Sequence, residues 1–403
     1  MKSETRTIIS AIYLWLLFFT TSTAQECRPQ QYQMYSTQQV LNITSPNYPN
    51  AYTPGSSCRY KILAPLDHVV ILNCVFEVYP NSCGSENFYV SRDGDFQYRD
   101  AEIFCSSGSI RRTSLFRSIT FAYSSIATTT NLRGRFFCQA ITRPQSCDCG
   151  WSFTPRITNG QEANKHEYPS MVALRDITSP QLIFCGGNII SHRHILTAAH
   201  CTSTHRDPSR IMAYAGDHDL SSTTESAFAA QYNIQQIIQH PGYISNSAAV
   251  ANDIALLVTS RIIEWSRGVG PVCLPYRQSA ESFTYLYVNV AGWGTLTFAG
   301  SKSNTLQKAE LLTMDNRACQ IQYNSTILPS QICTYDYSGT GRDSCQYDSG
   351  GPVIQKQTRM YLIGIISFGR TCGTRYAVGV NTRITAFLNW IWSYVGGNNI
   401  CVI

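Results

Sequence analysis

Residues 343–352 read Asp343-Ser344-Cys345-Gln346-Tyr347-Asp348-Ser349-Gly350-Gly351-Pro352. A serine hydroxyl is a poor nucleophile unless a base takes its proton, so Ser349 gains chemical meaning only if the chain supplies a base elsewhere. The two glycines that follow permit a tight turn in which the backbone approaches a bound group closely, as an oxyanion site requires. Taken alone, the same string is equally compatible with an ordinary surface turn.

Two distant strings supply possible partners for this serine. Residues 196–201 read LTAAHC, and residues 252–257 read NDIALL. The resulting chain order His200, Asp253, Ser349 is that of the chymotrypsin-type catalytic triad. A single histidine is more often a packed or surface residue, but the residues around His200 favour the catalytic interpretation. The pattern therefore predicts acyl transfer by an activated serine.

Further motifs extend this match over the second half of the chain. They are RITNG at 156–160, FCGG at 184–187, AGWG at 291–294 and GIISFG at 364–369. From residue 157 to about residue 397 the chain resembles a trypsin-like serine protease. The resemblance implies a two-β-barrel, chymotrypsin-like domain with the active site between the barrels. Apolar residues at helical spacing also predict a helix over 385–395, which Gly396 ends.

The first half of the chain reads as a different β-rich unit. Short apolar runs alternate with turn clusters between Cys27 and about Ala140, which predicts an antiparallel β-sandwich. The strings ITSPNYPN at 43–50, CRY at 58–60 and AP at 64–65 give this segment a resemblance to a CUB domain. We therefore expect an all-β protein with a CUB β-sandwich at 27–140, an exposed linker at 141–156, a protease domain at 157–397 and a tail at 398–403.

Metal binding is not expected in either half. Many CUB domains bind calcium through three acids, but here Ser124 or Ser125 stands where an aspartate is expected beside Glu77 and Glu86. Hard cations require several carboxylate oxygens, so we interpret the two glutamates as solvated surface residues. The string HRH at 192–194 has no third ligand to complete a zinc site.

Composition and the N-terminus indicate a secreted protein. A chain of 403 residues with 43% hydrophobic and 14% charged residues fits two folded domains rather than a disordered chain. Lys2 and Arg6 precede an apolar run at 8–19, and small residues at 22–24 offer a cleavage site, so residues 1–24 read as a signal peptide. No second apolar stretch is long enough to span a bilayer. The net charge is +6, but the sequence has no run of Lys or Arg, so we expect neither a membrane nor a nucleic acid as partner.

The 16 cysteines predict a disulfide framework formed in an oxidising compartment. The CUB resemblance implies Cys27–Cys58 and Cys83–Cys105 and leaves Cys74 with Cys138. The protease resemblance implies Cys185–Cys201, Cys319–Cys333 and Cys345–Cys372. By likeness to related two-chain proteases we favour Cys149–Cys273 and Cys147–Cys401, although the spacing equally permits Cys147 and Cys149 to exchange partners.

The protease resemblance also implies activation by cleavage between Arg156 and Ile157. In the family the freed ammonium group of Ile157 inserts beside the acid that precedes the serine, here Asp348. An unpaired buried carboxylate is costly, so this pairing is expected to order the loop that carries Ser349.

The same resemblance assigns the specificity pocket. Asp343 stands where trypsin-like members place the acid at the base of the pocket, which favours Arg or Lys at the cleaved position. The walls correspond to Ser367, Gly369 and Gly379, and the glycines leave the pocket open.

Tyr347 departs from the family pattern. Family members have glycine at this position, whose N–H forms the oxyanion hole together with that of Ser349. Tyrosine keeps the N–H. If the oxyanion hole requires backbone dihedral angles that favour glycine, a tyrosine there costs about 1–3 kcal/mol of backbone strain. We therefore expect an active but narrow protease.

Together these features predict a secreted zymogen that becomes a serine endopeptidase cleaving protein substrates after Arg or Lys. The arrangement resembles arthropod CUB serine proteases, including those of insect venoms. The alternative is a catalytically silent homologue that binds partners. An activating protease and a CUB ligand are implied but not identified, and Asn42 and Asn324 begin candidate glycosylation sequons.

Overall fold

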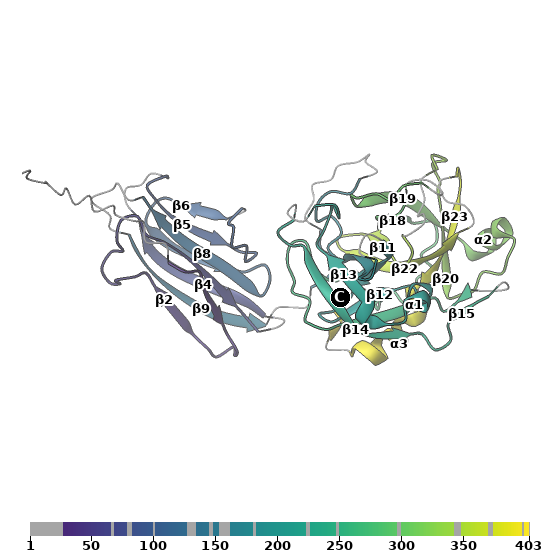
Figure 1. Ribbon diagram of the computed structural model, residues 1–403, viewed down its shortest axis with the longest axis horizontal. Coiled ribbons are helices and arrows are strands. Elements are labelled where there is room, and N and C mark those ends of the chain that lie inside the picture. Colours follow the sequence, from purple (N-terminus) through teal and green to yellow (C-terminus); the bar gives the residue numbers. More distant parts are fainter. Residues whose placement is uncertain are drawn as a thin grey trace, which may run out of the picture.

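The computed structural model describes residues 27–402, apart from 66–67, 79–82, 100, 127–133, 145–147, 153–161, 180–182, 223–225, 247–249, 296–299, 342–347, 370–373 and 397–398. Figure 1 shows two β-rich bodies side by side, the first formed by the N-terminal strands in purple and blue and the second by the teal to yellow remainder. The predicted signal peptide lies outside the described residues.

The first body is a sandwich of two sheets with the strand orders β1-β3-β8-β5-β6 and β2-β9-β4-β7. Along β9 the residues alternate between buried and partly exposed, so that Phe136, Cys138 and Ala140 point into the core. Cys74 and Cys138 pair directly across β4 and β9 and form a disulfide. This confirms the expected β-sandwich. The strands are β1 (Gln30–Gln33), β2 (Leu41–Thr44), β3 (Ser57–Leu63), β4 (His68–Glu77), β5 (Glu86–Ser91), β6 (Glu102–Phe104), β7 (Gly108–Thr113), β8 (Ser118–Ser125) and β9 (Arg135–Pro144).

The interpretation of Glu77 and Glu86 as solvated residues is wrong for Glu86. Its side chain is 0% exposed, because Glu86, Phe88 and Val90 share the inward face of β5. Burial and the adjacent Glu86 carboxylate raise the pKa of Tyr52. Glu77 forms an ion pair with Arg135 at 2.7 Å.

The second body contains two closed six-stranded barrels, as the protease resemblance implied. The first barrel comprises β10 (Met171–Asp176), β11 (Ile183–Ile189), β12 (His194–Thr197), β13 (Ile211–Ala215), β14 (Ala230–Gln239) and β17 (Ala255–Thr259). The second comprises β18 (Tyr287–Gly292), β19 (Gln307–Met314), β20 (Gln331–Tyr335), β21 (Pro352–Lys356), β22 (Met360–Gly369) and β23 (Val378–Arg383). The short ribbon of β15 (Ile244–Ser245) and β16 (Val250–Ala251) falls between β14 and β17 along the chain. The helices are α1 (Ala199–Thr204), α2 (Asn316–Tyr323) and α3 (Leu388–Val395), with short 3₁₀ turns at Pro208–Arg210 and Ile384–Phe387.

The predicted C-terminal helix is present, but its first turn is the 3₁₀ turn Ile384–Phe387 and α3 follows it. Gly396 ends α3 with φ of 78°, a backbone conformation that side chains disfavour. The expected exposed linker is shorter than predicted. Strand β9 continues to Pro144, and Cys149 is completely buried because it is disulfide-bonded to Cys273.

Six of the expected disulfides lie within the described residues and are formed: Cys27–Cys58, Cys74–Cys138, Cys83–Cys105, Cys149–Cys273, Cys185–Cys201 and Cys319–Cys333. Cys147, Cys345 and Cys372 lie outside the described residues, so the other two pairings remain predictions.

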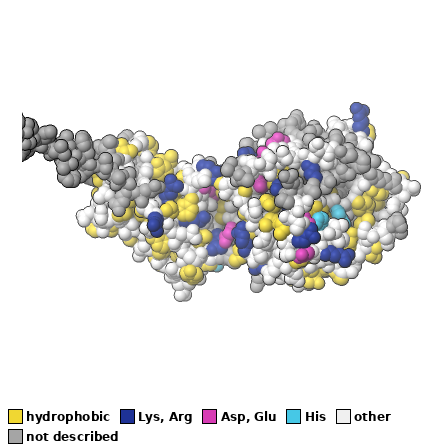
Figure 2. Space-filling view, viewed as in Figure 1, with side chains coloured by type: hydrophobic (Ala, Val, Ile, Leu, Met, Phe, Trp, Pro, Cys, Tyr) yellow, Lys and Arg dark blue, Asp and Glu magenta, His cyan; other side chains and the backbone are white. Residues whose placement is uncertain are grey.

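The surface carries no continuous basic area on the face shown in Figure 2, where Lys and Arg side chains are scattered among acidic and uncharged ones. In the described part of the chain no helix combines the length and hydropathy needed to cross a membrane.

Candidate active site

The first barrel brings His200 and Asp253 together by strand pairing. Strand β12 ends at Thr197, which pairs with Ala255 at the start of the antiparallel strand β17. Residues just after β12 therefore lie next to residues just before β17, and α1 carries His200 in its first turn. The Asn252 backbone adopts φ of 53°, and its side chain donates to the carbonyl of Gly242, which holds the turn that carries Asp253.

Asp253 is buried and receives three hydrogen bonds. The backbone N–H of His200 donates to Oδ1 at 2.8 Å, and the imidazole Nδ1 lies 2.8 Å from Oδ2. The hydroxyl of Ser367 donates to Oδ2 at 2.5 Å. Burial by itself would raise the pKa of Asp253, but these hydrogen bonds and the His200 charge outweigh it and hold the pKa below its usual range.

Ser367 was predicted as a wall of the specificity pocket, and the structure gives its side chain a second contact. It lies on β22 of the second barrel, yet its hydroxyl reaches the acid that belongs to the first barrel. Thr382 on β23 likewise donates its hydroxyl to the backbone carbonyl of Asp253 at 2.7 Å. The sequence contained no local signal for either contact, because both depend on how the two barrels pack.

The Ser349 turn is fixed to both barrels through its backbone. Gly186 in β11 donates to the carbonyl of Ser349 at 2.8 Å, and Gly350 donates to the carbonyl of Ile366 in β22 at 2.8 Å. A Cβ atom at Gly350 would lie 2.3 Å from the Thr197 hydroxyl and 2.5 Å from the carbonyl of Gly186. With φ of 80° as well, this position admits glycine only.

The imidazole of His200 faces the Ser349 turn across the Cys185–Cys201 disulfide. Its Nε2 lies 3.7 Å from Sγ of Cys201, and the same sulfur lies 3.7 Å from the carbonyl oxygen of Ser349. Among the described residues no hydrogen bond joins the Ser349 hydroxyl to His200. Catalytic hydrogen bonds are often long in ligand-free enzymes and shorten when substrate binds.

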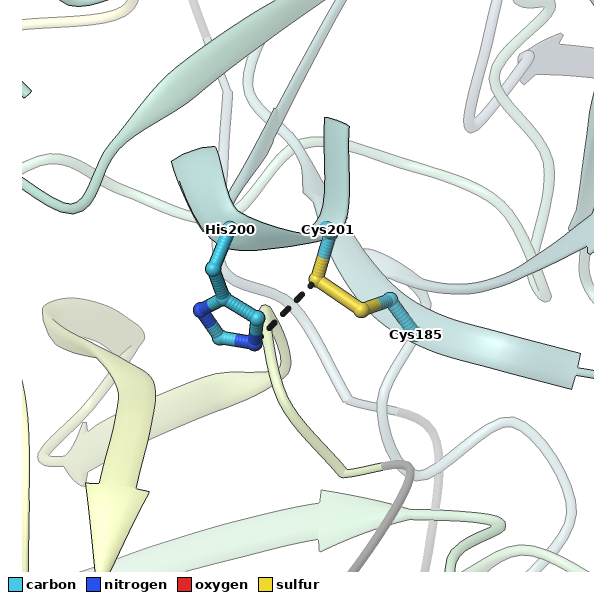
Figure 3. Close-up of side chains that lie close together, drawn as sticks. All are labelled: Cys185, His200 and Cys201. Carbon is cyan, nitrogen blue, oxygen red and sulfur yellow. Dashed lines mark hydrogen bonds between the residues drawn. A yellow bond between two sulfur atoms is a disulfide. The ribbon is translucent and has the colours of Figure 1, made fainter. Parts of the chain in front are cut away.

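Cys185, His200 and Cys201 place one ligand atom each within 4.8 Å of the others, as a metal site would (Figure 3). Cysteine binds metals as a thiolate, whereas both sulfurs here are joined in a disulfide. The group therefore does not fit a zinc site. The disulfide instead ties α1 to β11.

The carboxylate of Asp348 lies against the AGWG motif. Gly294 donates its N–H to Oδ1 at 2.8 Å, and a Cβ atom at Gly292 would come within 2.0 Å of the same oxygen. The close approach of the acid thus explains why position 292 is a glycine.

Of the predicted pocket walls, Gly369 and Gly379 lie directly opposite each other on β22 and β23. Among the described residues, a Cβ atom at Gly369 would lie within 4 Å of the carbonyl oxygen of Val378 alone, at 3.8 Å. Arg156, Ile157, Asp343 and Tyr347 lie outside the described residues.

One residue near the pocket was missed by the sequence analysis. Asp336 follows β20, is completely buried, and accepts hydrogen bonds from Ser338 and from the N–H of Gly341 at 2.7 Å. Its own N–H donates to the carbonyl of Ala377, just before β23. Asp336 therefore links the segment that leads to Asp343 with the segment that leads to Gly379. The Asp-x-Ser turn pattern at 336–338 was the available signal.

Two closed barrels with a histidine–aspartate pair on one and a glycine-bounded serine turn between them define a chymotrypsin-fold serine hydrolase. The chain belongs to the trypsin family of serine proteases, whose family model (Trypsin) matches residues 157–391. A second family model, CUB domain, matches residues 31–134.

Several similar proteins are proteases of arthropods. Venom serine protease 34 of Apis mellifera is 31% identical over 408 residues, covering 98% of this chain and 95% of the relative. Venom serine protease of Polistes dominula is 37% identical over 268 residues, 65% of this chain and 93% of the relative. Proclotting enzyme of Tachypleus tridentatus is 31% identical over 261 residues, 62% of this chain and 68% of the relative. These relatives support a serine endopeptidase with protein substrates.

Proposed function

We propose that this protein is a secreted zymogen, activated by cleavage between Arg156 and Ile157, that hydrolyses proteins after Arg or Lys. The observation that carries the proposal is the buried Asp253 bonded to Nδ1 of His200, with the Ser349 turn next to this pair. Relatives named as a venom serine protease and a proclotting enzyme are consistent with secretion.

The proposed chemistry is acyl transfer through Ser349. Its hydroxyl oxygen attacks the scissile carbonyl carbon while Nε2 of His200 takes the proton, and the same proton then passes to the leaving amine. Water subsequently attacks the acyl-enzyme, with His200 again acting as base, and the acid product leaves. Asp253 holds the imidazole with Nδ1 protonated and stabilises the imidazolium that forms in both steps.

Specificity and transition-state stabilisation are assigned to residues around this centre. Asp343 would pair with the basic side chain of the substrate at the base of the pocket, with Gly369 and Gly379 as its walls. The N–H groups of Tyr347 and Ser349 would bind the oxyanion. This reaction needs no metal or organic cofactor. We also propose no calcium site in the CUB domain, since Glu77 already pairs with Arg135.

Activation is assigned to the new N-terminus of Ile157. Its ammonium group would pair with Asp348, whose other contact with Gly294 already orients the carboxylate. The disulfide Cys149–Cys273 would keep the CUB domain attached after cleavage, because Cys149 precedes the cleaved bond and Cys273 follows it. The activating protease and the CUB ligand are not identified by any residue described above.

The test is cleavage at Arg156–Ile157 followed by a serine-directed covalent probe. Labelling at Ser349, absent from uncleaved protein and from Ser349→Ala, supports the endopeptidase. Complete cleavage without labelling would instead support the silent homologue, for which the unusual Tyr347 is the motivating residue. Peptides with Arg, Lys or Leu at the cleaved position then test the pocket assignment.

A further inference from the structure

The sequon Asn42-Ile43-Thr44 coincides with strand β2, at the edge of the second CUB sheet. Alternate residues of a strand face opposite sides, so Ile43 is buried in the core while Asn42 and Thr44 are exposed on the outer face. Gln139 on β9 donates to the side-chain oxygen of Asn42 at 3.3 Å. That bond directs the amide nitrogen, the atom that is glycosylated, away from the neighbouring strand.

Part of the outer face beside this sequon is apolar. Thr44 pairs with Phe137, and Phe137 pairs in turn with Val75 on β4, which is 60% exposed. The ring of Tyr48, which is 45% exposed, has its centroid 6.1 Å from that of Phe137. Single exposed apolar residues are ordinary on protein surfaces, but here the exposed Val75 and Tyr48 flank the partly buried Phe137 next to a sequon.

We propose that Asn42 carries an N-linked glycan whose first N-acetylglucosamine unit packs on Phe137, Tyr48 and Val75. In the transfer step the amide nitrogen of Asn42 bonds to the anomeric carbon of a lipid-linked oligosaccharide, loses a proton and displaces the lipid pyrophosphate. The C–H face of a pyranose is apolar and matches an aromatic surface in the way that other apolar groups do. This inference rests on the proposed secretion, because the glycan donor is met only along that route.

The second sequon offers a matched control. Asn324 is the C-terminal cap of α2 with φ of 48°, so replacing it would disturb the backbone as well as the sequon. Thr326→Ala removes this sequon and keeps the cap. The exposed large apolar side chain on this helix is that of Ile321, which is aliphatic rather than aromatic.

The experiment compares four forms of the full-length protein purified from a secreting insect-cell line: unmodified, Asn42→Gln, Thr326→Ala and Phe137→Ala. Intact mass is measured first. We expect Asn42→Gln to lose the mass of one glycan while Phe137→Ala keeps it. Absence of a glycan on Asn42 in the protein of wild-type sequence would overturn the inference. Probe labelling at Ser349 in the same preparation would show that the proposed enzyme activity is correct nonetheless.

Thermal unfolding of the CUB domain then tests the packing. Asn42→Gln should unfold about 2–5 °C below the unmodified protein, a shift of the size that a change in surface packing gives in a domain of this length. Trimming with an endoglycosidase that leaves the first sugar should retain most of this difference, and Thr326→Ala should not reproduce it. In the Phe137→Ala background, adding Asn42→Gln should produce little further shift. An equal shift in both backgrounds would refute the sugar–aromatic contact.

Discussion

Replacing Trp151 by Ala is expected to loosen the CUB domain from the protease domain. The indole ring lies between Phe116 of the CUB domain, at 5.4 Å, and Trp265 of the protease domain, at 6.5 Å. It packs so closely on Gly270 that a Cβ atom there would come within 1.8 Å of the ring. The neighbouring Gly150 is hydrogen-bonded on both sides to protease backbone, so Trp151 acts as part of the protease surface.

The second contact between the two domains is an ion pair. Arg117 Nη1 lies 2.9 Å and 3.1 Å from the two carboxylate oxygens of Glu264. The Glu264 side chain is 48% exposed, so solvent screens this pair and it contributes about 0.2–1 kcal/mol.

The aromatic contact should contribute more. One aromatic pair is worth about 0.5–1.5 kcal/mol beyond the area it buries, so Trp151→Ala should weaken docking by about 1–1.5 kcal/mol. That energy corresponds to a change of about 5- to 12-fold in the docking equilibrium. Adding Arg117→Ala should bring the total to about 2 kcal/mol, or about 30-fold. The Cys149–Cys273 disulfide keeps the domains tethered, so the result is a more extended molecule rather than dissociation.

Small-angle X-ray scattering measures this directly. The double variant Trp151→Ala/Arg117→Ala should have a larger radius of gyration and maximum dimension than the unmodified protein, and 1 M salt should reproduce only the smaller, ionic part of the change. Trp392→Ala is the control, because that indole lies on α3 and contacts Tyr276 within the protease. Scattering profiles that superimpose for the double variant and the unmodified protein would show that these contacts do not set the domain arrangement.

Other expectations concern the site. Ser367→Ala removes a donor to Asp253 and should lower kcat about 10-fold, the loss expected for one charge-assisted hydrogen bond, as peptide hydrolysis at saturating substrate would show. The pKa of Asp253 is lower in the folded protein than in the unfolded chain, where it is about 3.9. The ionised Asp253 therefore stabilises the fold fully above that pH, and this stabilisation is lost as the pH falls through the lower folded pKa. The denaturation midpoints of wild-type protein and Asp253→Asn should consequently converge at acid pH. Asp336→Asn should raise KM for Arg peptides more than it lowers kcat, at a stability cost of about 1–3 kcal/mol measured by thermal unfolding. Protein cleaved at Arg156 should migrate as one band without reductant and two with it.

His200 and Asp253 were predictable because each lies in a short sequence motif whose other residues are fixed by local packing or strand pairing. Ala199 is buried in α1, and Ala255 starts the barrel strand that pairs with Thr197. The burial of Glu86 was also predictable, because Glu86 alternates with the apolar Phe88 and Val90 along β5 and therefore shares their inward face despite its charge.

What the sequence could not provide are contacts between parts that only the folded chain brings together. Trp151 stands alone in a segment without periodicity, and its partners Phe116 and Trp265 belong to different domains. The hydrogen bond of Ser367 is similar, because its hydroxyl lies on the second barrel and donates to Asp253 of the first. No spacing rule along the chain predicts such pairs, because they depend on the packing of separately formed units.

Each barrel positions catalytic residues that belong to the other. Asp253 comes from the first barrel but receives hydroxyl hydrogen bonds from Ser367 and Thr382 of the second. The Ser349 turn enters the second barrel but is bonded to Gly186 of the first. Each half of the proposed catalytic machinery is therefore positioned by the opposite barrel, so a shift between the barrels would disturb the acid and the nucleophile together. Variants at the barrel interface should consequently lose activity before they lose either barrel's fold.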